Sequence, residues 1–485
     1  MRLKLFIGLI LLCLISILIY KKYYNPSSAE LLLQYTPDSC NTIILINASS
    51  IQNKLLLDGI QHFSQIDSLR KAFTDEKLNI LFQQAFESSI VLNNQIIAFE
   101  YKGFNGIVFE YTDNSKLQTY FQNTLVPLYE INIDTNLQFI QFKNYPITLS
   151  WTKKHLYLLQ HKEKTIIERL VKNAARTLTK TDSLLLQGFP DNDVSIFSNN
   201  HFNIDSIPVI KYIHHFYATI NFEKGKIQLN TNFQFNIGKQ SYYSSLFNTG
   251  KKNIQHNNSS PLSFSVCINP TSFFKQKDAA IWWDKAGLND NTIKCWNGQF
   301  CYVYEGMDTI QQQIVTYEYD DDFNKIEVIK NVAKNIHKHK LAVGYANSKL
   351  LDSVFFSLKK DKLINDKQGK IQVINTFDQA YFISNNSEWL CISGTINDTS
   401  SFKAKQKTSI FEFNLSPQGL QADFIKRFAS KKLNYDALQF KHINFSFKQS
   451  SNNNYNANLT ITFNSELNGL FELGRNIQGF SFAVN

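Results

Sequence analysis

The stretch that decides the fold is NLQFIQFKNYPITLSWTKKHLYLLQ at residues 136–160, and KIQVINTFDQAYFISNNSEWLCISG at residues 370–394 repeats its pattern. Each stretch contains three short runs in which apolar and polar residues alternate, and polar turns separate the runs. Such alternation is typical of strands with one buried face. Ser150 of the first stretch stands opposite Ser384 of the second. We therefore predict a three-stranded meander in each half of the chain.

Other segments repeat in the same order on both sides of these stretches. Two of them, residues 42–54 and 264–276, are apolar strands that lead into an Asn-x-Ser/Thr-Ser turn able to cap a helix, with Asn47 opposite Asn269. Each half is also expected to contain a hairpin, and in its second strand Tyr111 and Asp113 of the first half match Tyr319 and Asp321 of the second half. The remaining pairs are residues 92–101 with 296–305, 194–199 with 408–413, and 217–235 with 440–463.

The chain has 485 residues, which is longer than a single core usually grows, so two domains are expected. Its 40 Phe and 22 Tyr favour strands. The apolar stripe of residues 163–175 recurs at helical spacing and predicts a helix that packs on a sheet. We predict an α+β fold: an N-terminal transmembrane helix, then two tandem duplicated modules of mainly antiparallel sheet with packed amphipathic helices. The boundaries are 1–24 for the cytoplasmic tip and anchor, 25–35 for a linker, 36–250 for the first module, 251–260 for a second linker and 261–485 for the second module.

The N-terminus holds an uncharged apolar run, LFIGLILLCLISILIY, from Leu5 to Tyr20. Its sixteen residues are slightly short for a bilayer, but the flanking lysines and tyrosines can extend the effective length. Only a weak cleavage site follows at residues 27–29, so we expect an uncleaved anchor, with a cleaved signal peptide as the alternative. The location predicted is the inner membrane, single-pass, with the soluble body in the periplasm.

The formal net charge of +10 is spread along the chain. Its densest region, residues 325–370, carries eleven lysines interrupted by acidic residues. A solvated face is the expected role, and attraction to an anionic lipid or polymer is the alternative. No sequence motif of a nucleic-acid-binding module accompanies the lysines, so we predict no nucleic-acid partner.

Cysteine usage predicts free thiols. Besides Cys13, the chain has Cys40, Cys267, Cys295, Cys301 and Cys391, an odd number without a C-x-x-C pair. Three of these five lie in apolar, strand-like runs, where a free cysteine is expected to be buried. A bridge between Cys295 and Cys301 stays open as an alternative.

The sequence contains no phosphate-binding glycine loop, no G-x-S-x-G motif of serine hydrolases and no H-E-x-x-H motif of zinc proteases. The acidic run at residues 320–322 has the wrong spacing for an EF-hand and suits a solvated loop. His337 and His339 alternate, so an extended segment would place both rings on one face, but nearby lysines oppose a cation. His214 and His215 are adjacent on an expected helix and diverge. We therefore predict no catalytic, cofactor-binding or metal residues and no cofactor.

Exposed aromatics can also form binding surfaces. Trp282 and Trp283 are the clearest candidates, with core packing as the expected role and a partner surface as the alternative.

The anchor, the strand-to-Asn/Ser turns, and the W-N-G-Q strand followed by YEYDDDFN at residues 317–324 resemble a loose group of membrane-anchored, exported proteins of Bacteroidota. This resemblance implies an envelope location and a duplicated α+β module, and it carries over no catalytic residue. We expect a non-enzymatic binding or scaffold protein that is held in the membrane by its N-terminal helix and has an envelope protein as partner. The alternatives are an enzyme with a site between the modules, for instance a hydrolase, and a periplasmic chaperone or lipid-handling protein.

Overall fold

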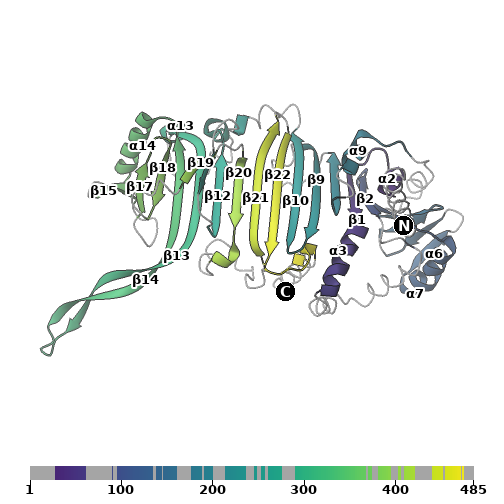
Figure 1. Ribbon diagram of the computed structural model, residues 1–485, viewed down its shortest axis with the longest axis horizontal. Coiled ribbons are helices and arrows are strands. Elements are labelled where there is room, and N and C mark those ends of the chain that lie inside the picture. Colours follow the sequence, from purple (N-terminus) through teal and green to yellow (C-terminus); the bar gives the residue numbers. More distant parts are fainter. Residues whose placement is uncertain are drawn as a thin grey trace, which may run out of the picture. The chain divides into compact units, whose positions relative to one another are not determined.

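A computed structural model gives the fold of the chain (Figure 1). The chain divides into two compact units, Met1–Phe222 and Glu223–Asn485, which are described separately. The prediction of modules at 36–250 and 261–485 stays a prediction. The residues that the structure describes are 28–61, 90, 95–134, 138–144, 146–160, 176–187, 191–199, 213–235, 245–247, 253–256, 260–275, 290–367, 370–373, 381–394, 402–405, 409–420, 440–451, 454–470 and 472–473.

The predicted α+β class with a transmembrane helix is wrong. Of the described residues, 58% are in strands and 22% in helices, and the strands pair in an antiparallel manner. The abundance of ring-bearing and β-branched side chains favours strands to a greater extent than the prediction allowed. None of the helices among the described residues is long and apolar enough to cross a membrane. The predicted anchor, Leu5–Tyr20, and the predicted helix at residues 163–175 lie outside the described residues.

The first unit contains one antiparallel sheet with the strand order β4-β5-β6-β7-β3-β2-β1-β8-β9. Its strands are β1 (Thr42–Asn47), β2 (Gln95–Tyr101), β3 (Phe104–Glu110), β4 (Ile131–Asp134), β5 (Phe139–Phe142), β6 (Thr148–Trp151), β7 (His155–Leu159), β8 (Val194–Asn199) and β9 (Ile213–Glu223). Its helices are α2 (Ser28–Leu33), α3 (Ala48–Gln61), α6 (Asn114–Tyr120) running into η1 (Phe121–Leu125) and α7 (Val126–Leu128), and α9 (Lys180–Gln187).

The second unit follows the order β10-β22-β21-β20-β12-β13-β14-β18-β17-β16-β15, and β11 pairs separately with β19. Its strands are β10 (Lys226–Phe235), β11 (Asn253–His256), β12 (Leu262–Cys267), β13 (Trp296–Tyr319), β14 (Lys325–Tyr345), β15 (Ile364–Lys367), β16 (Lys370–Val373), β17 (Tyr381–Asn385), β18 (Trp389–Ser393), β19 (Phe402–Lys405), β20 (Ser409–Leu415), β21 (Phe440–Ser451) and β22 (Asn454–Phe463). Its helices are α11 (Pro270–Phe273), α13 (Asp290–Cys295), α14 (Ser348–Lys360) and the short η4 (Pro417–Gly419).

The meanders predicted from the sequence are confirmed: β5, β6 and β7 pair in turn in the first unit, as do β16, β17 and β18 in the second. The pairing that surrounds them also recurs. The first unit runs β7-β3-β2-β1-β8-β9 and the second runs β18-β14-β13-β12-β20-β21. The alignment that paired Tyr111 with Tyr319 is wrong, however, because the counterpart of Tyr111 is Tyr345. Their hydroxyls donate to equivalent turn carbonyls, those of Thr152 and Asn386.

The reason for that error is the length of the β13–β14 hairpin. These strands have 24 and 21 residues, against seven in each of β2 and β3. The additional length carries the YEYD sequence far from the position of Tyr111, so local similarity selected the wrong residue.

All five cysteines of the described residues are free and buried. The bridge between Cys295 and Cys301 is therefore not formed. Burial raises the pKa of the Cys40 thiol to about 12, so this thiol stays protonated and unreactive.

A buried ion pair joins the end of α2 to α9 in the first unit. The Arg176 guanidinium donates to both carboxylate oxygens of Asp182, at 2.6 and 2.8 Å, and its Nε donates to the carbonyl of Thr36 at 3.0 Å. Thr179 donates to Asp182 through its backbone N–H and its hydroxyl. Burial of the Asp182 carboxyl acts to raise its pKa, but these hydrogen bonds and the charge of Arg176 outweigh it, so that the pKa is lowered.

We predict that Asp182→Asn lowers the free energy of unfolding by about 3 kcal/mol, because it leaves the buried charge of Arg176 with only the exposed carboxylate of Asp38, 3.7 Å away, as counter-ion. Denaturant titration at neutral pH measures the loss. A carboxyl with a lowered folded pKa stabilises the fold above its unfolded pKa, and the effect disappears as pH falls below about 4. The difference between wild type and variant should therefore shrink on acidification. Asp191→Asn, at an exposed position, is the control. An equally large and pH-independent loss in both variants contradicts the assignment.

Candidate functional site

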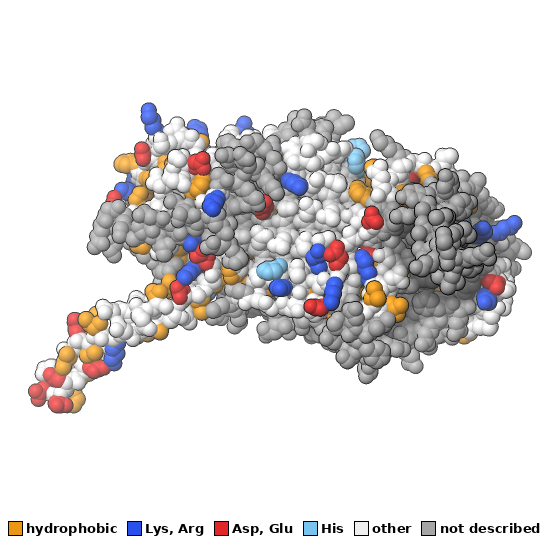
Figure 2. All heavy atoms as spheres, in the orientation of Figure 1, with side chains coloured by type: hydrophobic (Ala, Val, Ile, Leu, Met, Phe, Trp, Pro, Cys, Tyr) orange, Lys and Arg blue, Asp and Glu red, His pale blue; other side chains and the backbone are white. Residues whose placement is uncertain are grey.

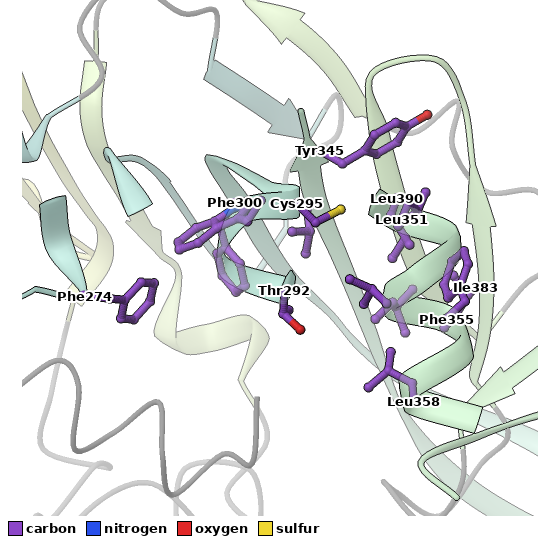
Figure 3. Close-up of a pocket in the computed structure, with 15 residues that line it drawn as sticks. Phe274, Thr292, Cys295, Phe300, Tyr345, Leu351, Phe355, Leu358, Ile383 and Leu390 are labelled. Carbon is purple, nitrogen blue, oxygen red and sulfur yellow. The ribbon is translucent and has the colours of Figure 1, made fainter. Parts of the chain in front are cut away.

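The second unit contains an apolar cavity of about 380 Å³ beneath helix α14. Strands β13, β14, β17 and β18 form one wall, and beside them lie residues of α13 and Phe274, which follows α11 (Figure 3). Figure 3 shows Leu351, Phe355 and Leu358 along the helix. The lining residues are Phe274, Thr292, Cys295, Trp296, Phe300, Val343, Gly344, Tyr345, Leu351, Val354, Phe355, Leu358, Ile383, Leu390 and Ile392.

The spacing of apolar residues in α14 explains how the helix forms the roof of this cavity. Leu351, Val354, Phe355 and Leu358 recur at helical intervals, so they share one face and turn toward the strands. The helix starts where the side chain of Asn347 accepts from the backbone N–H of Lys349 at 2.9 Å. Lysines occupy the last turn, where they complement the helix dipole. Sequence and capping thus fix the position of the roof.

The W-N-G-Q motif builds the wall opposite. Gly298 has φ +93°, and a Cβ at this position would lie 1.7 Å from the carbonyl oxygen of Ile268. Only glycine permits this approach of backbone to backbone. The indole of Trp296 donates to the carbonyl of Gln299 at 2.7 Å. The tight segment thereby places Trp296 and Phe300 in the lining.

The cavity exists because the second unit has smaller side chains where the first has rings. In the first unit the corresponding space is filled by Trp151, whose ring lies 5.2 Å from that of Phe121. In the first unit Trp151 of β6 pairs with Leu156 of β7. In the second unit the residue at the equivalent position is Asn385 of β17, which pairs with Leu390 of β18 and is exposed.

A second ring is missing at the helix. Tyr120 lies seven residues after the helix-capping Asp113 in the first unit, and Val354 lies seven residues after the helix-capping Asn347 in the second. Tyr120 packs against the aromatic core of the first unit. The same framework therefore encloses a filled core in one unit and a cavity in the other.

The chemistry of the lining favours binding of an apolar group. Its polar atoms are few, and the hydroxyl of Tyr345 already donates to the carbonyl of Asn386. Burial raises the pKa of the Cys295 thiol, which makes it a poor nucleophile. Among the lining residues there is no carboxylate or imidazole to act as a general acid or base.

Among the described residues, none of the chemical candidates predicted from the sequence lines this cavity. Asp320 accepts from the backbone N–H of Asn324 at 2.7 Å in the β13–β14 turn. Asp321 and Asp322 are exposed in the same turn. The described residues contain no group of three or more His, Cys, Asp or Glu side chains suited to a metal ion. The two tryptophans at 282 and 283 lie outside the described residues.

The four histidines considered from the sequence all lie in β-strands. His337 and His339 share a face of β14, with ring centroids 6.1 Å apart, and hydrogen-bond to the hydroxyls of Tyr304 and Tyr302. The helix expected at residues 214–215 is wrong: both residues lie in strand β9, where the alternation of Ile213–Glu223 suits a strand.

The cavity was not predicted from the sequence, because its lining is apolar and contains no motif of catalytic or metal-binding residues. The available signal was the apolar stripe of residues 351–358 together with the W-N-G-Q turn. Neither indicates a void until the two units are compared position by position.

Comparisons with known proteins leave the family open. No family model matches the chain, and no curated protein matches it. Among solved structures, crystal form III of TP0453 is similar with a TM-score of 0.29 and 9% identity, covering 47% of this chain and 89% of that chain. Crystal form IV of TP0453 has a TM-score of 0.28 and 8% identity, covering 49% and 90%. Similarity of this size assigns neither a family nor a function.

We predict that Gly298→Ala destabilises the second unit by more than about 2 kcal/mol, because it adds a backbone clash to the strain of a positive φ. Gly306→Ala is the matched control: Gly306 also has a positive φ, +98°, but a Cβ there meets no atom within 4 Å. It should cost only the strain, about 1 kcal/mol. Denaturant unfolding of both variants measures the difference. Equal losses would show that the close approach to Ile268 has no role.

Proposed function

We propose that the protein is a non-enzymatic binding protein of the cell envelope that holds the apolar part of an amphiphile, a lipid acyl chain, beneath α14. The observation that carries this proposal is the cavity of about 380 Å³ with its almost wholly carbon lining. Small-molecule sites are typically pockets of about 300–1,000 Å³ with mainly hydrophobic walls. A lining without a general acid or base supports binding over the hydrolase alternative.

The energetic cost of an unfilled cavity supports an occupant. The cavity is partly open to solvent, so its carbon lining exposes apolar surface to water when empty, at a cost of roughly 25 cal/mol per Å². Water does not relieve that cost, because it finds few polar partners among these residues. An acyl chain restores the missing dispersion contacts and removes apolar surface from water.

The sequence supports a location where acyl chains are at hand. In this proposal the protein lies at the inner membrane with its body in the periplasm, a location that the export-type apolar run Leu5–Tyr20 favours. Ligand exchange with the bilayer then takes place over a short distance. The scaffold role and an envelope protein partner remain compatible with lipid binding.

We predict that a photoactivatable fatty acid, fed to cells that make the full chain and then irradiated, labels peptides from residues 348–360 and 381–394. Val354→Trp should lower this labelling by about tenfold, equivalent to about 1.4 kcal/mol of binding, because the indole fills the cavity. Mass spectrometry of the purified chain locates and quantifies the label.

The control is Phe356→Trp, which adds an indole to the exposed outer side of the same helix and should leave labelling unchanged. Leu358→Trp is a second filling variant in case Val354→Trp unfolds, and a thermal melt reports folding for each. The proposal fails if folded filling variants are labelled as strongly as wild type, or if the label is spread over exposed surfaces.

A further inference from the structure

The β13–β14 hairpin extends beyond the rest of its sheet and forms an arm, residues 307–337. On one side β12 pairs with β13 only as far as Tyr304, and on the other β18 pairs with β14 only as far as Lys340. Beyond these points the described residues provide the arm with no third strand. Figure 1 shows it projecting from the second unit. Two-stranded hairpins alone are marginally stable in water, and their free edges can pair with other chains.

The arm exposes large apolar side chains along its whole length. Figure 2 shows hydrophobic side chains along the shaft and acidic ones at its end. Tyr319 is 68% exposed and Ile329 66%. The strand register places these side chains on both faces of the two-stranded ribbon, with Val315 opposite Ile329 on one face and Ile326 opposite Glu318 on the other. The exposed apolar residues are Ile310, Ile314, Val315, Tyr317, Tyr319, Phe323, Ile326, Ile329 and Val332.

The tip presents one aromatic ring in an unfavourable backbone conformation. Phe323 is 85% exposed and has φ +61°, a region that costs a non-glycine residue about 1 kcal/mol. The turn is held by Asp320, whose backbone carbonyl accepts from the N–H of Phe323 at 2.9 Å and whose side chain accepts from that of Asn324. Exposed Asp321 and Asp322 precede the ring. The tip therefore presents one exposed aromatic ring, that of Phe323, next to two exposed carboxylates.

A complementary surface lies on the outer side of α14. Phe356 is 74% exposed there, on the side of the helix opposite the cavity. Lys349, Lys359 and Lys360 are exposed on the same helix. Lys359 pairs with Asp366 at 3.3 Å, but this ion pair is exposed and therefore weak. Exposed Asp352 lies one turn before Phe356, so the cationic part of this face is its C-terminal end, where Lys359 and Lys360 follow the ring and complement the acidic tip in charge.

We propose that the tip of the arm docks on the outer face of α14 in a second copy of this chain. Phe323 packs against Phe356 and the lysine stems, while Asp321 and Asp322 approach Lys359 and Lys360. The arm points away from α14 of its own unit, so the contact forms between copies (Figure 1). Because the two surfaces differ, the contact is head-to-tail and propagates unless its rotation closes a ring. The acidic tip favours this occupant over an anionic membrane surface.

We predict that the full chain in a non-ionic detergent self-associates as its concentration rises, more strongly at low salt, because charge attraction is screened at high salt. Sedimentation velocity measures the mass. Phe323→Ser, the pair Asp321→Lys with Asp322→Lys, and the pair Lys359→Glu with Lys360→Glu should each shift the distribution to the monomer. Mixing the two charge-reversed proteins should restore association, at least as heterodimers. Gln311→Lys, in the middle of the arm, is the control and should associate like wild type.

A cross-link locates the contact without relying on the strength of association. With diamide added as the thiol oxidant, a chain with Asp322→Cys, mixed with one carrying Lys360→Cys, should form a disulfide-linked dimer, since the native cysteines of the described residues are buried. Gln311→Cys should not cross-link to Lys360→Cys under the same conditions.

Three outcomes overturn the proposal. The first is a single monomeric species at every concentration. The second is self-association that the tip variants leave unchanged. The third is binding of wild type, but not of Phe323→Ser, to anionic phospholipid vesicles without association between copies, which would assign the tip to a membrane surface. None of these results depends on the occupant of the cavity, which lies on the other side of α14.

Discussion

The second unit depends on one strand, β13, and on the antiparallel backbone ladder that holds it. Residues 299–304 pair with β12 and place Phe300 in the wall of the cavity, and residues 307–319 form one edge of the arm. Cross-strand ion pairs support the ladder where it leaves the sheet, as between Lys340 and Glu305 at 2.8 Å and between Lys338 and Asp308 at 2.7 Å. Cavity and arm are thus two consequences of one extended strand.

Differences in side-chain volume between the units account for the cavity beneath α14. Both units share the strand order and a helix that covers the meander. Both also have a tyrosine, Tyr111 or Tyr345, whose hydroxyl donates to a carbonyl in the turn after the second strand of the meander. These features come from backbone hydrogen bonding and tolerate changes in side-chain volume. Replacement of the indole at 151 by an amide at 385 therefore opens space without altering the framework. One strand framework therefore accommodates both a packed core and a cavity.

The sequence was sufficient where one face of a strand is buried and insufficient where three-dimensional volume matters. Alternation in residues 136–160 predicted β5, β6 and β7. Alternation also placed His337 and His339 on one face of a strand. The helix predicted at His214 and His215 was wrong, because these residues lie in strand β9, and the pairing of Tyr319 with Tyr111 was wrong because it rested on local similarity alone. The cavity was not predictable, because an absent ring leaves no motif. Only comparison of Asn385 with Trp151 in the paired strands reveals it.

The lysines of residues 325–370 also acquire distinct roles once the strands are placed. Those on β14 alternate with apolar residues of the arm, and Lys330 pairs with Glu318 across the ladder at 2.6 Å. Charges at such positions protect an exposed hairpin from unspecific edge-to-edge pairing. The tip differs, since Phe323 follows the acidic residues 320–322. A net value of +10 therefore conceals an arm whose shaft carries lysines and whose tip is acidic.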